Sequence, residues 1–337
     1  MQHNNNTFDQ LSTTKAVSQR PLRDRLGMLI EGSDTADVVA RIRETELAGL
    51  RQIWMKVDAA GVGMPDVLTL LAAAALRTEQ VRLGTAIVPI YPRHPLIMAQ
   101  QALAIHDLAP GRLRLGIGPS NRMVIEDWLG LQFSSPLAYL TEYIQVMRKI
   151  MEGDANHQGR FFQMAFSQTR QFSVPLLVSA LGKKAFQLAG EIADGAISWM
   201  SPASYLLASA LPALQAGAEQ RRRPTPPLIA HVLVALHPNQ EAVLSPVRQL
   251  VAGYSRLPFY ARMFAEAGFA GAVDGREADL NALASALVIS GDEATVYQHI
   301  TELLDSGLDE LMLQLIPIVD ETNERKQLHH LLGSLPA

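Results

Sequence analysis

The stretch RLGTAIVPIYPRHPLIMAQQALAIHDLAPGRLRLGIGPS, residues 82–120, holds two short apolar runs on either side of a longer segment of helical period. The runs cover residues 81–88 and 113–117 and are rich in leucine and β-branched side chains, which is typical of buried strands. We interpret the stretch as a strand, a helix and a second strand, the repeating unit of an α/β fold.

The same rhythm extends over the rest of the chain. The apolar runs that we interpret as strands occupy residues 26–30, 52–56, 81–88, 113–117, 176–179, 195–199, 228–236 and 310–315. Two helical segments have clear ends: 33–49 starts with the capping residues Ser33 and Asp34, and 291–307 stops at Gly307. Eight strands too apolar to face water on either side predict a closed (β/α)8 TIM barrel, with an open doubly wound sheet as the alternative.

Two stretches exceed a minimal barrel and are interpreted as insertions, residues 153–174 and 253–275. Long insertions in a compact domain often act as lids or interface elements. The polar segment 1–22 reads as a disordered N-terminal arm, so we predict one barrel domain over residues 23–337.

Composition limits the possible partners. A net charge of -4 gives no electrostatic footprint for nucleic acid or an anionic membrane, and the 337 residues include no cysteine. No secretory signal is visible, and no stretch reaches the roughly 18 apolar residues of a membrane span. These features predict a soluble cytoplasmic protein whose partners are small molecules and a second copy of itself.

The glycines in GIGPS, residues 116–120, raise the question of a phosphate-binding loop. The dinucleotide fingerprint G-x-G-x-x-G fails because Asn121 stands where the third glycine would be, and no G-K-[ST] follows. In a barrel this segment would end the fourth strand at the catalytic face, where Gly116 and Gly118 would let a ligand approach the backbone. A tight turn is the equally weighted alternative.

Two further segments are candidates at the same face. After the fifth strand ends at Ser179, the backbone amides of residues 180–183 could hold a phosphate at a helix N-terminus, with charge added by Lys183 or Lys184. An ordinary strand-to-helix turn is the alternative. The proline-stiffened loop in LGTAIVPIYPRHP, residues 83–95, carries His94, which is either catalytic or a hydrogen-bonded loop residue.

In their order along the chain, five stretches together resemble the bacterial luciferase-like monooxygenase superfamily. They are residues 82–120, YLTEYIQVMRKIMEG (139–153), GRFF (159–162), VPLLVSALGKKAFQLAGEIADGAISWM (174–200) and SGDEATVYQHITELLDSGLDELML (290–313). The set looks closest to the branch of that superfamily that uses the deazaflavin coenzyme F420.

The resemblance implies a (β/α)8 barrel with the cofactor ring over the C-terminal ends of the strands, a non-proline cis peptide at Ala86–Ile87 and a homodimer. It also implies that Trp199 closes the site. The cofactor-binding residues carried over in this way are Thr85, Ala86, Ile87, Pro119, Ser120, Ser179, Ala180, Leu181, Gly182, Lys183 and Trp199.

Hydride transfer is the cofactor's chemistry, which explains why the sequence offers no catalytic triad, carboxylate pair or metal cluster. Where several family members carry an Asp-His or His-His pair after the second strand, this chain has WMKVDAAG, residues 54–61. We therefore take Lys56 and His94 as the candidate catalytic residues. A rim position for Lys56 is the alternative.

The sequence thus predicts an F420-dependent oxidoreductase that moves a hydride between deazaflavin and a small organic substrate whose identity it does not reveal. Alternatives are a reduced-FMN-dependent two-component monooxygenase, a non-catalytic flavin- or deazaflavin-binding protein, and an aldolase-like barrel. The polyglutamate tail of F420 favours a basic rim, for which the candidates are Arg93, Arg122, Lys183 and Lys184. Glu31 after the first strand, residues 56–64 and the insertion carrying Pro258, Phe259 and Tyr260 are expected to line the substrate pocket; packing of these aromatic residues onto the barrel is the alternative.

Overall fold

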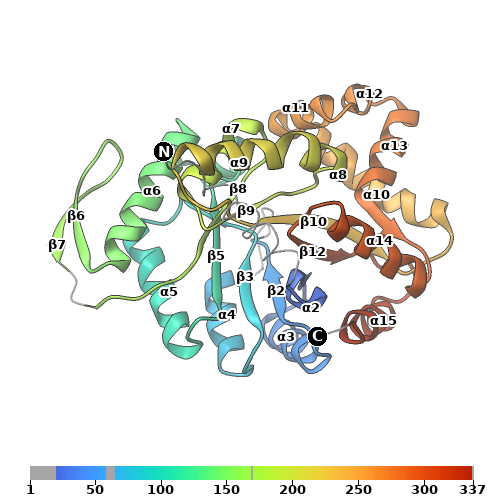
Figure 1. Ribbon diagram of the computed structural model, residues 1–337, viewed down its shortest axis with the longest axis horizontal. Helices are drawn as coiled ribbons and strands as arrows, with labels where there is room; N and C mark the ends of the chain where they lie inside the picture. Colours follow the sequence, from blue (N-terminus) through green and yellow to red (C-terminus); the bar gives the residue numbers. More distant parts are fainter. Residues whose placement is uncertain (1–19, 58–64, 168–169, 336–337) are drawn as a thin grey trace, which may run out of the picture.

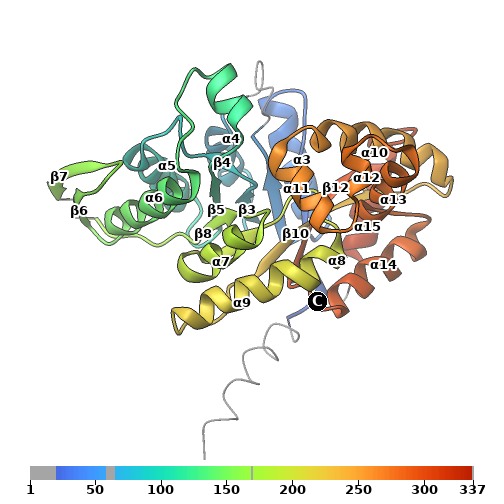
Figure 2. The same ribbon diagram turned by 90° about the horizontal axis from the view of Figure 1, so that it is seen from above.

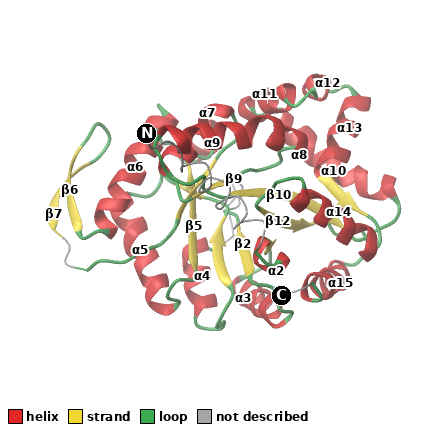
Figure 3. Cartoon of the chain, viewed as in Figure 1, coloured by secondary structure: helices red, strands yellow, loops and turns green. Residues whose placement is uncertain are grey.

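The chain folds as a closed ring of eight parallel strands surrounded by helices (Figures 1 and 3), as seen in a computed structural model that describes residues 20–57, 65–167 and 170–335. The ring strands are β1 (Leu26–Leu29), β2 (Gln52–Met55), β3 (Arg82–Thr85), β5 (Leu113–Gly118), β8 (Leu176–Ser179), β9 (Gly195–Ile197), β10 (Leu228–Ala235) and β12 (Glu310–Leu315). Their order around the ring is β10–β12–β1–β2–β3–β5–β8–β9, and β9 pairs back with β10. All eight predicted strands are therefore confirmed, and the open sheet is wrong.

Two short strands pair with strands of the ring without being part of it. The predicted strand 81–88 divides into β3 and β4 (Val88–Pro89), and β4 pairs with the end of β5. The interruption contains the cis peptide bond between Ala86 and Ile87, at the position that the family resemblance implies. The second short strand, β11 (Val288–Ser290), pairs with β10 outside the ring.

Helices form the outer layer, as the view from above also shows (Figure 2). The longer ones are α3 (Thr35–Leu47), α4 (Val67–Ala75), α5 (Pro95–Leu108), α6 (Pro136–Met151), α7 (Lys183–Ile192), α9 (Leu211–Gln220), α10 (Gln240–Ser255), α11 (Pro258–Glu266), α13 (Glu277–Leu287), α14 (Glu293–Asp305) and α15 (Glu321–Gly333). Shorter turns are α2 (Leu22–Arg25), α8 (Ala203–Tyr205), α12 (Ala270–Val273) and the π-helices η1 (Met123–Trp128) and η2 (Leu206–Ala210).

The helix ends that the sequence predicted are confirmed. Asp34 caps α3 by accepting from the backbone N–H groups of Ala36 and Asp37, and α14 is capped in the same way by Asp292. Gly307 follows α14 with a positive φ of 109°, a backbone conformation that favours glycine.

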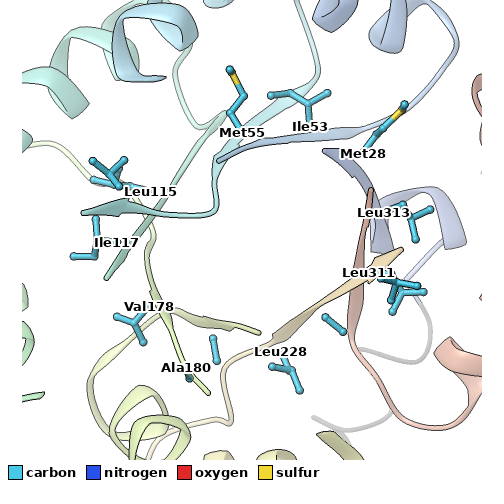
Figure 4. Packing of buried hydrophobic residues seen from close by; sticks show 14 of the residues in the cluster. Met28, Ile53, Met55, Leu115, Ile117, Val178, Ala180, Leu228, Leu311 and Leu313 are labelled. Atoms are coloured by element: carbon cyan, nitrogen blue, oxygen red, sulfur yellow. The ribbon is translucent and has the colours of Figure 1, made fainter. Parts of the chain in front are cut away.

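Strand side chains alternate between two apolar cores. Ile53 and Met55 lie outside the ring of strands, where they pack toward the helices (Figure 4). Trp54, between them in sequence, points inward and anchors a second cluster inside the barrel. The members of this inner cluster are Leu29, Trp54, Ala86, Leu177, Ile197, Ile229 and Met312, with Ile87 and Trp199 packed against it.

A charged group fills the barrel near the N-terminal ends of the strands. Arg114 and Glu310, both buried, form an ion pair at 2.5 Å, and the Arg114 guanidinium lies over the Trp54 ring, 4.9 Å from its centroid. Burial acts to raise the pKa of Glu310, but Arg114 and Arg20 hold that pKa below its usual value. Arg114 and Glu310 are far apart in the sequence, and no local pattern marks them as partners.

Both insertions contain secondary structure. Within 153–174, β6 (Asp154–Gln158) and β7 (Gln163–Ser167) form an antiparallel hairpin, whose turn is held by Glu142 of α6 through the backbone N–H groups of residues 160–162. Residues 253–275 contribute α11 and α12. Most of the predicted N-terminal arm, residues 1–19, lies outside the described residues; Arg20 pairs with Glu310 at 3.0 Å.

Candidate functional site

Several cofactor-site candidates converge at the C-terminal ends of neighbouring strands. Ala86, Ile87 and Trp199 all contact the inner cluster of the barrel. A Cβ added to Gly118 would lie 2.1 Å from Ser179 Oγ and 3.3 Å from Ile87 Cδ1, so the ends of β5 and β8 adjoin the segment after β3. Four separate parts of the sequence therefore meet around one mouth of the barrel.

The two glycines of GIGPS make room for neighbouring protein atoms. A Cβ on Gly116 would lie 2.0 Å from the Thr85 carbonyl oxygen, and the space beside Gly118 is taken by Ser179. The buried Thr85 hydroxyl donates to Gly116 O and accepts from Gly116 N, both at 2.8 Å. Close strand packing therefore requires both glycines, and the approach of a ligand to this backbone stays a prediction. The turn follows at Ser120, whose φ is +62°.

The N-terminus of α7 offers unused backbone donors. Gly182 is the N-cap, and no side chain caps this helix. Ala180 N–H donates to Ile197 O within the ring, so this amide of the predicted phosphate-binding stretch 180–183 is not available to a ligand. In the part of the chain that the structure describes, the amides of residues 181–184 have no acceptor, while Tyr205 Oη donates to Leu181 O at 2.9 Å and holds the turn.

The candidate basic rim divides into paired and unpaired residues. Arg93 forms an ion pair with Asp66, and Arg122 forms one with Glu126 at 2.5 Å. Lys183 and Lys184 are exposed at the start of α7 and have no ion pair among the described residues. These two lysines are the charges of the predicted rim that are free to meet an anion.

Trp199 is half-buried and stacks on a buried residue at the mouth. Its indole stacks on the imidazole of His231 with ring centroids 3.8 Å apart and planes at 17°. Its Nε1–H donates to Tyr254 Oη at 2.8 Å, and Tyr254 in turn contacts Tyr260 of α11, with ring centroids 4.7 Å apart. The aromatic insertion thus packs onto the barrel through Trp199.

His231 and Gln314 are site residues that the sequence analysis missed. His231 Nε2 lies 2.8 Å from Gln314 Oε1, and both side chains are buried within the ring. A signal was present, because each is a polar residue in an otherwise apolar strand, LIAHVLVA in β10 and ELMLQL in β12. Burial lowers the pKa of His231 to about 3, with a further lowering contribution from Lys56.

The two catalytic candidates fall in different contact networks. Lys56 follows β2 and forms an ion pair at 2.5 Å with Glu31, which follows β1. His94 is the N-cap of α5: its Nδ1 accepts from Leu96 N at 3.2 Å, and its ring lies edge-on to Phe162. Burial lowers the pKa of His94. The hydrogen-bonded loop role weighed for His94 matches these contacts.

Part of the predicted substrate pocket, residues 58–64, lies outside the described residues.

Among the described residues, no three His, Asp or Glu side chains are grouped so that they could hold a metal ion. None of the described helices is both long enough and apolar enough to cross a membrane.

Comparison with known proteins adds a family and a set of related folds. Residues 20–310 match the family model described as luciferase-like monooxygenase. The chain is 30% identical over 197 residues to the F420-dependent glucose-6-phosphate dehydrogenase of Microbacterium testaceum, a match covering 55% of this chain and 58% of that protein. Over the first three curated relatives, the matches span 40% to 58% of the relative's length.

Two solved structures share the fold. The coenzyme F420 dependent tetrahydromethanopterin reductase from Methanopyrus kandleri has a TM-score of 0.71 at 20% identity, over 92% of this chain and 97% of that one. The oxygenating constituent of 3,6-diketocamphane monooxygenase of Pseudomonas putida, solved in complex with FMN, has a TM-score of 0.65 at 17% identity, over 87% and 88%. At these identities both likenesses bear on the fold alone.

Proposed function

The chain belongs to the luciferase-like monooxygenase family, and from that premise we propose that it is an F420-dependent oxidoreductase acting on a small organic substrate. The relative from Microbacterium testaceum, which is F420-dependent, supports the choice of cofactor. The reaction would take place at the C-terminal face of the barrel. Bound there, the deazaflavin supplies the hydride chemistry, so the protein has to bind, orient and exclude water.

The observation that carries the proposal is the start of α7. Unused amides at residues 181–184 and the positive end of a ten-residue helix form a natural phosphate site. Lys183 and Lys184 add two exposed charges beside it. A cofactor with a phosphate and an anionic tail of glutamates fits this combination.

The remaining cofactor contacts are assigned by their places around the mouth. Ala86, Ile87 and Trp199 offer apolar surface for the ring, while Pro119 and Ser120 flank the path toward α7. Ser179 closes the end of β8 beside them. Thr85 supports this wall from within, because its hydroxyl is bonded to the backbone of Gly116.

Lys56 is the stronger of the two catalytic candidates. It lies near the stack at the mouth, since its charge contributes to lowering the pKa of His231. Its partner Glu31 neutralises the charge of Lys56 itself. We assign Lys56 to substrate binding on the side opposite the cofactor, and His94 to capping α5.

A reduced-FMN-dependent monooxygenase is the second candidate, favoured by the FMN-bound member among the structures that share the fold. The amides of α7 would serve the FMN phosphate equally well, whereas the two lysines favour the longer F420 tail. The deciding experiment is a fluorescence titration of the protein with F420 and, separately, with FMN.

Micromolar or tighter binding of F420, with FMN weaker by at least a factor of about ten or roughly 1.4 kcal/mol, supports the proposal. The reverse preference favours the monooxygenase and calls for oxygen-consumption assays with reduced FMN. Binding of neither overturns the cofactor assignment. Turnover of F420 with any organic acceptor then excludes a purely cofactor-storing protein.

We also propose a homodimer formed by the face of α3 and α4. An apolar groove on this face is lined by Val39, Ala40, Leu47 and Ala73, with Arg43 and Glu44 beside them. A two-fold axis repeats the same patch on both subunits, so adjacent opposite charges on one copy can pair with those on the other. A second copy of the chain therefore fits this groove.

A further inference from the structure

Gln314 and His231 face the inside of the barrel from neighbouring strands. Their exposed fractions are 8% and 3%. The ladder between β10 and β12 pairs His231 with Met312 and Leu233 with Gln314. Because residues two apart on a strand share a face, Gln314 points inward like Met312 but lies nearer the C-terminal mouth.

The contacts of His231 assign its tautomer. The backbone N–H of Met200 donates to Nδ1 at 3.4 Å, so the ring proton is on Nε2. Nε2–H then donates to Gln314 Oε1 at 2.8 Å. Burial keeps the pKa of His231 low, so the ring stays neutral and the direction of these two bonds is fixed at neutral pH.

This arrangement orients the Gln314 carboxamide. A carboxamide carries an acceptor oxygen and a donor NH2 group on opposite sides, and His231 occupies the oxygen side. Within the described part of the chain, no side chain or carbonyl group accepts a hydrogen bond from Gln314 Nε2; the contact of this side chain with His231 runs through Oε1. Trp199 holds His231 by stacking, so a rigid series of hydrogen bonds ends at an unused donor.

The place of β12 in the ring indicates which side of the site this donor serves. The proposed cofactor segments follow β3, β5, β8 and β9, whereas β12, β1 and β2 form the other arc. Lys56 and Glu31 lie on that same arc and neutralise each other. A neutral oxygen acceptor, a carbonyl, therefore suits this arc better than a carboxylate.

We propose that Gln314 donates a hydrogen bond from Nε2 to a carbonyl oxygen of the ligand bound at the mouth, and that His231 is the positioning residue that holds the carboxamide in this orientation. The identity of that ligand rests on the proposed function, because the carbonyl belongs either to the cofactor ring or to the substrate. The tautomer of His231 does not rest on it.

The first test follows the side-chain NH2 signals of Gln314 by NMR in protein labelled with 15N-glutamine, assigned with Gln314→Leu. The protein is titrated with F420, and the ligand-free and F420-loaded forms are each titrated with cyclohexanone and with methylenecyclohexane, which has the same shape without the oxygen. Movement with F420 alone places the acceptor on the cofactor, and movement with cyclohexanone places it on the substrate. Signals that respond to neither carbonyl source, or equally to methylenecyclohexane, overturn the proposal.

Variants measure what the donor contributes. Gln314→Leu should lower the affinity for the carbonyl ligand that shifts the Gln314 signals. The expected loss is about two- to tenfold, which corresponds to one neutral hydrogen bond. Gln298→Leu makes the same chemical change on the exposed face of α14 and should leave that affinity unchanged. Equal affinities for the two glutamine variants contradict a role for Gln314.

His231→Phe tests positioning, since phenylalanine retains a ring against Trp199 but has no Nε2–H. A positioning role predicts that the Gln314 signals lose their ligand-dependent shift in this variant, whereas a purely structural role predicts lower stability with the shift retained.

The tautomer of His231 can be measured in the native protein. The 15N chemical shifts of the ring should show that Nε2 carries the proton at every pH from 5 to 8, and a proton on Nδ1 overturns the assignment. If F420 fails to bind while cyclohexanone still moves the signals, the proposed function fails and this inference stands.

Discussion

The bulk of the Trp54 side chain restricts which residue types can occupy the neighbouring strand positions. The indole fills the barrel interior, and a Cβ added at Gly84 or Gly27 would lie 2.3 Å or 2.5 Å from its ring atoms. The strands beside Trp54 therefore need glycine for space rather than for backbone freedom. The buried Arg114 guanidinium covers the same indole from the N-terminal side.

Gly84→Ala should lower the free energy of unfolding by about 1–3 kcal/mol, because the added methyl overpacks the barrel against Trp54. Urea denaturation measures the change. Gly253→Ala is the matched control: its Cβ meets nothing within 4 Å inside α10, so replacing glycine in a helix should stabilise by roughly 0.5–1 kcal/mol. Equal stability changes in the two variants would refute the packing argument.

His231 should make the protein sensitive to acid. Its pKa is about 3 in the folded chain against about 6.5 in an unfolded one, so the unfolded state binds the extra proton between these values. Stability from this residue is complete above pH 6.5 and falls toward pH 3 by up to about 1.4 kcal/mol per pH unit. Unfolding free energies from pH 4 to 8 should show a shallower slope in His231→Phe than in the native protein, and identical slopes would sink the idea.

Polar residues inside the barrel were the least predictable part of the site. His231, Gln314, Arg114 and Glu310 interrupt apolar strands, but only the closed ring brings them into pairs. Their positions on the strands can be predicted from the sequence. The register that joins β10 to β12, or that places Arg114 across from Glu310, cannot. Lys56 was identifiable because it directly follows a strand; its partner Glu31 lies 25 residues earlier (56 − 31).

At the level of elements, strands were predicted well because each is a buried apolar run bounded by polar turns. The hairpin of β6 and β7 was predicted only as an insertion. Its turn depends on Glu142, a residue of the preceding helix that accepts from the backbone N–H groups of residues 160–162. An anchor of this kind has no local signal, whereas the caps at Asp34 and Asp292 do.

The start of α7 yields a test of the cofactor site. Replacing Lys183 and Lys184 together by alanine should raise the Kd for F420 by about three- to tenfold at low salt, and by less at high salt, because exposed charges are screened. FMN should be affected less, since it lacks the anionic tail. Fluorescence titration gives both constants.

Lys326→Ala on the exposed side of α15 removes a positive charge far along the chain and serves as the control. An F420 affinity that falls as much in this control would mean that net charge, and not the position of the lysines, controls binding.

At the scale of the whole molecule, the groove on α3 and α4 is an exposed surface lined mainly by apolar side chains. Leu47, at the end of α3, is 75% exposed and lines the groove assigned to the dimer. For the proposed dimer, we expect Leu47→Glu to give a monomer, because two-fold symmetry would bury two unpaired carboxylates in one interface.

Size-exclusion chromatography with light scattering measures the mass of each form. Val319→Glu makes a similar change at a residue 80% exposed and outside the groove, and this variant should remain dimeric. Loss of the dimer in both variants, or in neither, contradicts the assignment of this face.

The position of β12 has a consequence for how the protein is made. This strand sits between β10 and β1, so it joins the last part of the chain to the first. During synthesis the other seven strands emerge while the ring still has two open edges, and exposed edges pair readily with other chains. We therefore expect a chain that ends before residue 310 to aggregate rather than to form a smaller working barrel.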